Sequence, residues 1–157
     1  MRKRIIGNGP GEVAAAEPDW MDLEHLAQVE ITSEEVDYPI ESALIPRMGP
    51  GWRAAQPGEQ MIRLQFDEPL RIKRIRLVFH EDEQERTQEF ILRWSSDGGQ
   101  SYREIVRQQY NFSPPGAERE LEDYEVDLDG VTVLELRILP DIDGGSARAS
   151  LVQLRLA

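Results

Sequence analysis

Two polar segments carry the side chains best suited to binding a sugar. The first is Arg86-Thr87-Gln88, and the second runs from Gln108 to Ser113. Planar amides, an arginine fork and aromatic rings are what sugar hydroxyls and sugar faces require. We therefore predict a ligand site with five candidate residues: Arg86, Gln88, Tyr110, Asn111 and Phe112. In the alternative interpretation, the aromatics plug one end of the fold and the amides satisfy exposed strand edges.

A sixth candidate is Arg53, which follows Trp52 after a long Gly/Pro loop. This pair could present an indole platform beside a cation. The alternative is that Trp52 packs inward at the start of a strand, and we favour the core for Trp52 while leaving the role of Arg53 open.

Two acidic segments raise the question of metal binding or catalysis. Asp141 and Asp143 alternate as in calcium loops, but the twelfth position of an EF-hand would fall on Val152, so we favour a solvated turn over a structural calcium site. His80 precedes several acids and could act as a general base or metal ligand, although a solvated rim is the simpler interpretation. The chain has no hydrolase, nucleotide-binding or zinc-protease motif, so we predict no enzyme and no cofactor.

Seven arginines occupy positions opposite apolar residues and should point away from the core. They are Arg63, Arg74, Arg76, Arg93, Arg107, Arg137 and Arg155. They could form an arginine-rich sheet face that docks an acidic protein, or they could be neutralised by acids on its rim.

The composition is that of a folded globular domain. The 157 residues carry a formal net charge of −12, which disfavours nucleic acid and anionic lipid as partners. No cysteine is present, and no stretch is apolar enough for a signal or transmembrane segment, so we expect a cytoplasmic protein. Residues 1–17 should form a flexible tail, and residues 18–157 a single domain. The oligomeric state stays open.

The hydrophobic pattern predicts an all-β fold. After Pro18, the residues Trp20, Leu23 and Leu26 recur at helical spacing, which predicts one short helix of about two turns. From Val29 onward, apolar residues alternate with polar ones in runs such as 62–66 and 75–79. About eight strands separated by Gly/Pro/Asp turns, with no second helix, predict an antiparallel β-sandwich or jelly roll.

The strand sequences also carry a family resemblance. They include Trp52-Arg53-Ala54-Ala55, Ile62-Arg63-Leu64-Gln65-Phe66 and Phe90-Ile91-Leu92-Arg93-Trp94-Ser95-Ser96-Asp97-Gly98. From about Val29 to its end, the chain resembles the discoidin, or coagulation-factor type C, domains, which share a galactose-binding-like jelly roll. The segment from Gly51 to Gln60 also resembles the N-terminal domain of the X-ray repair cross-complementing scaffold protein, a docking module with the same sandwich.

The resemblance implies binding rather than catalysis, with the ligand held by loops at one end of the barrel. The segments around Arg86 and Asn111 look like such loops. We therefore predict a non-catalytic, carbohydrate-binding-like module, with protein docking through the arginine face as the alternative. The fold alone does not fix the ligand.

Overall fold

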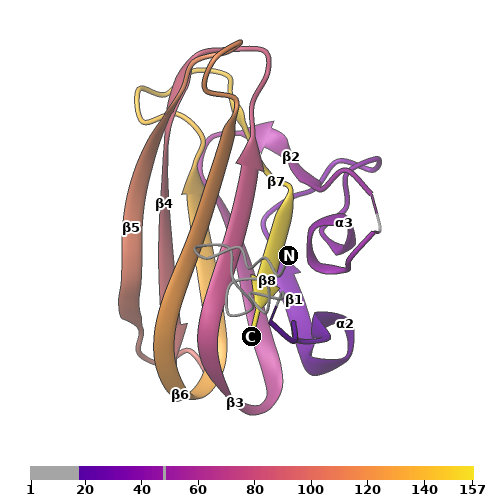
Figure 1. Ribbon diagram of the computed structural model, residues 1–157, viewed down its shortest axis with the longest axis vertical. Coiled ribbons are helices and arrows are strands. Elements are labelled where there is room, and N and C mark those ends of the chain that lie inside the picture. The colour runs from indigo at the N-terminus through magenta and orange to yellow at the C-terminus, as the bar shows by residue number, and fades with distance from the viewer. Residues whose placement is uncertain (1–17, 48) are drawn as a thin grey trace, which may run out of the picture.

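The computed structural model describes residues 18–47 and 49–157 (Figure 1). Residues 1–17, which we expect to form a tail, lie outside this part. The described chain forms two short helices and eight strands. In chain order they are α2 (Leu23–Leu26), β1 (Ala27–Ile31), α3 (Glu41–Leu44), β2 (Trp52–Pro57), β3 (Gln60–His80), β4 (Arg86–Ser95), β5 (Arg103–Phe112), β6 (Arg119–Leu139), β7 (Arg148–Leu151) and β8 (Gln153–Leu156).

Two long strands, β3 and β6, build both layers of a sandwich. The first part of β3 pairs with β1 on one side and with the second part of β6 on the other. This part of β6 pairs in turn with β4, and β4 pairs with β5. The rest of β3 pairs with β8 and with the first part of β6. Between these parts the register shifts, and both strands fold back at the bottom of Figure 1. The result is a five-stranded and a three-stranded layer with antiparallel pairing, which confirms the predicted sandwich.

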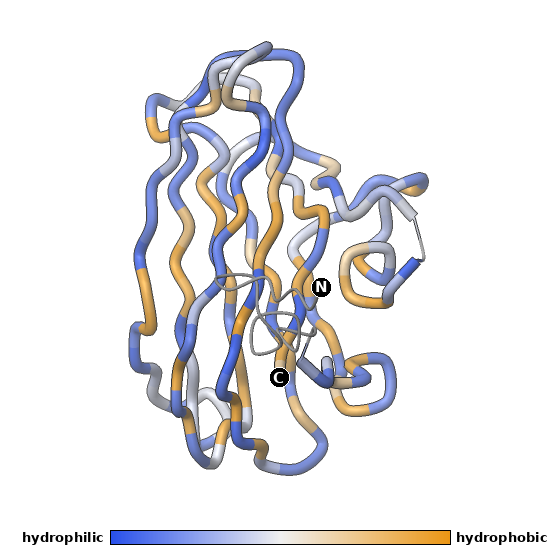
Figure 2. Tube along the Cα trace, in the orientation of Figure 1, coloured by the Kyte–Doolittle hydropathy of each residue, from blue (hydrophilic) through white to orange (hydrophobic). Residues whose placement is uncertain are grey.

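The core lies between the layers and takes one face of each strand. Apolar and polar residues alternate along the strands (Figure 2), as a period of two requires. In the three-stranded layer, Ile75, Leu77 and Phe79 are fully buried. Phe79 stacks on Phe90 of the five-stranded layer, with ring centroids 5.3 Å apart. This aromatic contact joins the two layers.

A separate two-stranded ribbon, β2–β7, packs beside the sandwich. Gly51, just before β2, has a φ of +113°, and a Cβ there would lie 2.5 Å from the carbonyl oxygen of Leu151. Only glycine therefore lets the two backbones come this close. Trp52 is 1% exposed, and its indole N–H donates to the carbonyl oxygen of Ser33 at 3.0 Å. Trp52 is thus a core residue, as favoured from the sequence.

Three secondary-structure elements differ from the predictions. The N-terminal helix has one turn rather than two, because β1 begins directly after Leu26. A second helix, α3, forms where we expected none. The predicted strands at 62–66 and 75–79 belong to one strand, because the polar segment between them bends without breaking the pairing to β6. Neither helix of the described chain has the length or the apolar character needed to cross a membrane.

Candidate ligand-binding site

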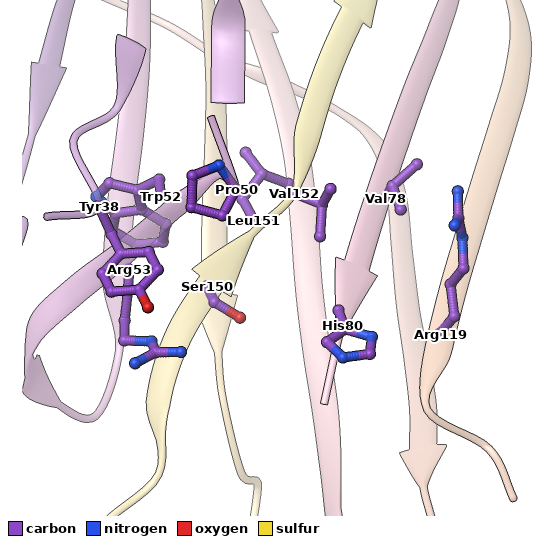
Figure 3. A pocket seen from close by; sticks show the side chains of 10 residues that line it. All are labelled: Tyr38, Pro50, Trp52, Arg53, Val78, His80, Arg119, Ser150, Leu151 and Val152. Atoms are coloured by element: carbon purple, nitrogen blue, oxygen red, sulfur yellow. The ribbon is translucent and has the colours of Figure 1, made fainter. Parts of the chain in front are cut away.

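Two strand ends and the β2–β7 ribbon enclose a groove on the surface. His80 ends β3, Arg119 begins β6, and the two residues pair in register. On the ribbon, Arg53 of β2 pairs with Ser150 of β7. Figure 3 shows these side chains together with Tyr38. They line a hollow of about 300 Å³. We call this hollow the cationic half of the strand-end groove.

Strand alternation turns these side chains toward the groove. Because Trp52 is buried in the core, its neighbour Arg53 must point outward. In the same way, Phe79 faces the core, so His80 lies on the outer face of the three-stranded layer, where it is exposed. The same pattern that builds the core therefore aims polar groups into the groove.

The loop before β2 fixes the position of Arg53. The Arg53 N–H donates to the Tyr38 carbonyl at 3.1 Å, and the Arg53 carbonyl accepts from the Glu35 N–H at 2.9 Å. The guanidinium lies 4.4 Å from the centroid of the Tyr38 ring, a cation–π contact. It also lies 3.9 Å from the Glu35 carboxylate. Arg53 is therefore held in place, although 46% of its side chain is exposed.

A second hollow, of about 260 Å³, extends the groove. It shares Arg53, His80 and Ser150 with the first, so the two are continuous. We call it the acidic half because carboxylates line it. These are Glu35, Glu81, Asp82 and Glu83.

Arginines hold two of these carboxylates. Arg148 donates to Glu35 at 2.5 Å, and Arg86 donates through Nε to Glu81 at 2.6 Å. Burial alone would raise the pKa of Glu81, but the hydrogen bonds from Arg86 and from two backbone N–H groups outweigh it and lower that pKa. Asp82 is 62% exposed and lies 3.6 Å from His80. The groove thus offers mainly hydrogen-bond donors in one half and acceptors in the other.

Solved structures with the same architecture include sugar-binding domains. A family 32 carbohydrate-binding module of NanJ from C. perfringens, in complex with galactose, superposes with a TM-score of 0.60, covering 83% of this chain and 92% of that one at 13% identity. A pectin-binding module superposes with a TM-score of 0.61, at 14% identity, covering 83% and 89%. This chain has the galactose-binding-like fold. The jelly-roll fold that the discoidin resemblance implied is thereby confirmed.

A third structure shows that the galactose-binding-like fold also accommodates an acidic sugar. The family 32 module of AlyQ, in complex with 4,5-unsaturated mannuronic acid, has a TM-score of 0.53 and 15% identity, covering 84% of this chain and 95% of that one. No protein-family model matches the sequence, and no curated protein matches it either. At these identities the similarity establishes the fold, and the function must be argued from the site.

The galactose-binding-like domain places three of the predicted site residues inside the sandwich. Arg86, Gln88 and Phe112 are 4%, 0% and 0% exposed. The Arg86 guanidinium lies 4.6 Å from the Phe112 ring centroid, and its Nη1 donates to the Pro140 carbonyl at 2.7 Å. The expectation that these residues lie in loops is wrong, because they lie within β4 and β5. Their part in ligand binding stays a prediction, and the contacts in the structure are those of an interior network.

The other two candidates in these segments lie on opposite faces of β5. Tyr110 packs edge-on against Phe112, with centroids 4.9 Å apart, and its hydroxyl donates to the Arg119 carbonyl at 2.9 Å. Asn111 points to the outer face, where its side chain accepts a hydrogen bond from Thr87 at 2.7 Å. The five residues therefore do not form one surface. Arg53 is the sequence-predicted candidate that lies in the groove.

The weak calcium candidates form a turn. The Asp141 carboxylate accepts from the Asp143 backbone N–H at 3.1 Å, as in an Asx turn. Among the described residues, the group of three side chains that could hold a metal is elsewhere, on the exposed surface at Asp22, Glu24 and His25. Calcium binding at Asp141 and Asp143 stays a prediction.

The arginines that were expected on one sheet face are divided between the two layers. On the five-stranded layer, three of them surround the fully buried carboxylate of Glu135. They are Arg63, Arg93 and Arg137, at 3.1, 2.6 and 2.9 Å. On the three-stranded layer, Arg74 and Arg76 share Asp123. These ion pairs lie within the domain, and docking of an acidic protein on such a face stays a prediction.

Sequence reasoning missed several residues of the groove, among them Tyr38, Arg119, Arg148 and Ser150. The pairing of β2 with β7 joins segments about a hundred residues apart, and hydrophobic periodicity carries no information on such pairing. For the three of these four that lie in strands, the usable signal was the outward position of the residue; Tyr38 lies in the segment before β2.

Proposed function

We propose that this domain is a non-catalytic carbohydrate-binding module and that the strand-end groove holds the sugar. The observation that carries the proposal is the groove's geometry: Arg53, His80 and Ser150 converge beside Tyr38 in a hollow of about 300 Å³. Arginine, imidazole and hydroxyl groups can all hydrogen-bond sugar hydroxyls, and an aromatic side chain supplies apolar surface for a pyranose ring. The hollow lies at the lower end of the range for small-molecule sites.

The known neighbours support a sugar as ligand. The NanJ module is described in complex with galactose, and another neighbour as pectin-binding. For this chain we place the contact at a rigid surface, because Arg53 and Ser150 lie on paired strands and the Tyr38 loop is hydrogen-bonded to β2. A site on rigid elements loses little conformational entropy on binding.

The proposal assigns no reaction to the groove. The histidine–carboxylate pair of the groove is His80 with Asp82, and their side chains are 48% and 62% exposed. Side chains so well solvated lack the buried environment that tunes catalytic acids and bases. Binding is therefore the activity that this arrangement supports.

The test is a glycan array of neutral and acidic oligosaccharides, followed by titration calorimetry with the glycan that gives the strongest signal. Arg53→Gln and His80→Ala should each weaken the affinity by about tenfold, since each removes a hydrogen bond worth about 1 kcal/mol or more. The matched control is Asn111→Ala, at an exposed position on a different strand. Thermal unfolding should show that all three variants are folded.

Two outcomes would refute the proposal. The first is that the wild-type domain binds no glycan of the array. The second is that Asn111→Ala abolishes binding while the Arg53 and His80 variants bind like wild type, which would place the site on the β4–β5 surface.

A further inference from the structure

The two halves of the groove differ in charge. The residues that line the cationic half include Arg53, His80 and Arg119 and no carboxylate. This is notable in a chain with 30 acidic residues and a net charge of −12. The hollow itself therefore offers guanidinium and imidazole groups to an anion. Carboxylates lie at its border with the acidic half, with Glu35 3.9 Å from Arg53 and Asp82 3.6 Å from His80. Charge acts there at contact distance, because salt screens beyond about 10 Å.

Arg119 is the arginine of the cationic half whose side chain makes the fewest polar contacts. Its carbonyl accepts the Tyr110 hydroxyl, but its guanidinium makes no hydrogen bond or ion pair with any residue of the described chain. By contrast, Arg74 and Arg76 on the same layer form ion pairs with Asp123. A guanidinium fork without a partner matches the geometry of a carboxylate, to which it can donate two parallel hydrogen bonds.

The acidic half shares Arg53 and His80 with the cationic half and is also lined by Arg148, but four carboxylates line it as well. Asp82 and Glu83 are exposed there, and Glu35 and Glu81 add two more carboxylates, each held by an arginine. Carboxylates accept hydrogen bonds from sugar hydroxyls but repel a second negative charge. A ligand that spans both halves should therefore carry its negative charge at one end only.

We propose that the groove selects an acidic oligosaccharide in which a uronic acid is linked to a neutral sugar. The uronate carboxylate lies in the cationic half, with Arg119 as its main partner and Arg53 and His80 nearby. The neutral sugar lies in the acidic half and donates its hydroxyls to Asp82 and Glu83. This inference rests on the proposed carbohydrate binding and adds the class of sugar and its orientation.

The experiment compares two forms of one probe by titration calorimetry. The probe is a disaccharide in which one glucuronate is linked to one N-acetylglucosamine, used as the free acid and as its neutral methyl ester. We expect the acid to bind about tenfold or more tightly, the difference to shrink as salt is raised, and Arg119→Gln to abolish it. The matched control is Arg71→Gln, which removes an exposed arginine paired with Asp127 elsewhere on the surface and should change neither affinity.

The outcomes separate this inference from the proposed function. Equal binding of acid and ester overturns the charge selection but leaves carbohydrate binding intact. A preference for the acid that persists in Arg119→Gln, or that is lost equally in Arg71→Gln, also overturns the inference, because general charge would then explain it. Absence of binding by any glycan of the array refutes the proposed function itself.

Discussion

Replacing Glu120 with glutamine should stabilise the folded domain at neutral and alkaline pH. Glu120 lies on the inner face of β6 and is 1% exposed. Gln88, from β4 in the opposite layer, donates to its Oε1 at 3.0 Å, and its Oε2 has no hydrogen-bond partner among the described residues. Burial, together with the neighbouring Glu122, raises the pKa of Glu120 from 4.5 to about 9. At pH 7 the folded state therefore keeps a proton that the unfolded chain releases.

The size and sign of the effect follow from linkage. Below the unfolded-state pKa of 4.5, Glu120 is protonated in both the folded and the unfolded state and does not change the free energy of unfolding. As the pH rises from 4.5 toward the folded-state pKa of about 9, only the unfolded chain releases the proton, so the free energy of unfolding falls. Each pH unit in that interval costs about 1.4 kcal/mol, so the full cost at pH 7 would be about 3 kcal/mol. Relaxation and water entry reduce such penalties, so we expect Glu120→Gln to gain about 1–2 kcal/mol at pH 7.

Urea unfolding of wild type and variant at several pH values between 4.5 and 8.5 measures this gain. Glutamine mimics the neutral carboxyl and keeps the acceptor for Gln88, so the two proteins should be equally stable near pH 4.5 and diverge as the pH rises. Glu125→Gln removes the same charge at an exposed position of β6 and is the control. The reasoning is refuted if Glu120→Gln is less stable than wild type at pH 8, since the ionised carboxylate would then be stabilised by its surroundings.

Two further replacements probe the framework. Glu135→Gln should lower the free energy of unfolding by about 3 kcal/mol, because it removes the buried charge that three arginines share. Urea unfolding should show a much smaller loss of stability for Asp127→Asn, at an exposed ion pair, and equal losses in the two variants would contradict the argument. Gly51→Ala should lower stability by about 2 kcal/mol and weaken sugar binding, because its Cβ would meet the Leu151 carbonyl at 2.5 Å. Gly58→Ala is the matched control, since it also has a positive φ but faces open space, and an equal loss there would mean that backbone strain alone is responsible.

Local periodicity was sufficient to predict the sandwich. A period of two is set by backbone geometry, so alternating residues such as Ile75, Leu77 and Phe79 identify a strand and its buried face without knowledge of its partners. The bend in β3 was hidden because Asp67 to Pro69 has the composition of a turn. Whether such a segment reverses the chain or only bends it depends on pairing with a strand far along the sequence, here β6.

The same limit applies to the groove, because a single strand shows where a side chain points but not which other segments it meets. Arg53 was found because it follows a Trp that had to be buried, which fixes its outward direction. Tyr38 was not found, because it meets Arg53 through hydrogen bonds of an irregular loop, and Arg119 was not found, because it reaches the groove through the β3–β6 pairing. A binding groove between strand ends is a property of topology, and single strands do not reveal it.

The density of polar groups drew the site prediction to β4 and β5, where the side chains form an interior network. Arg86 and Gln88 look like ligand contacts because buried arginine and glutamine are uncommon, and polar residues usually face water. Here each has partners that compensate burial: Glu81 and the Pro140 carbonyl for Arg86, and Glu120 for Gln88. Fully engaged side chains stabilise the end of the sandwich but have little capacity left for a ligand. The guanidinium of Arg119, without a partner in the described chain, retains that capacity, which is why the groove is the better place to look for the sugar.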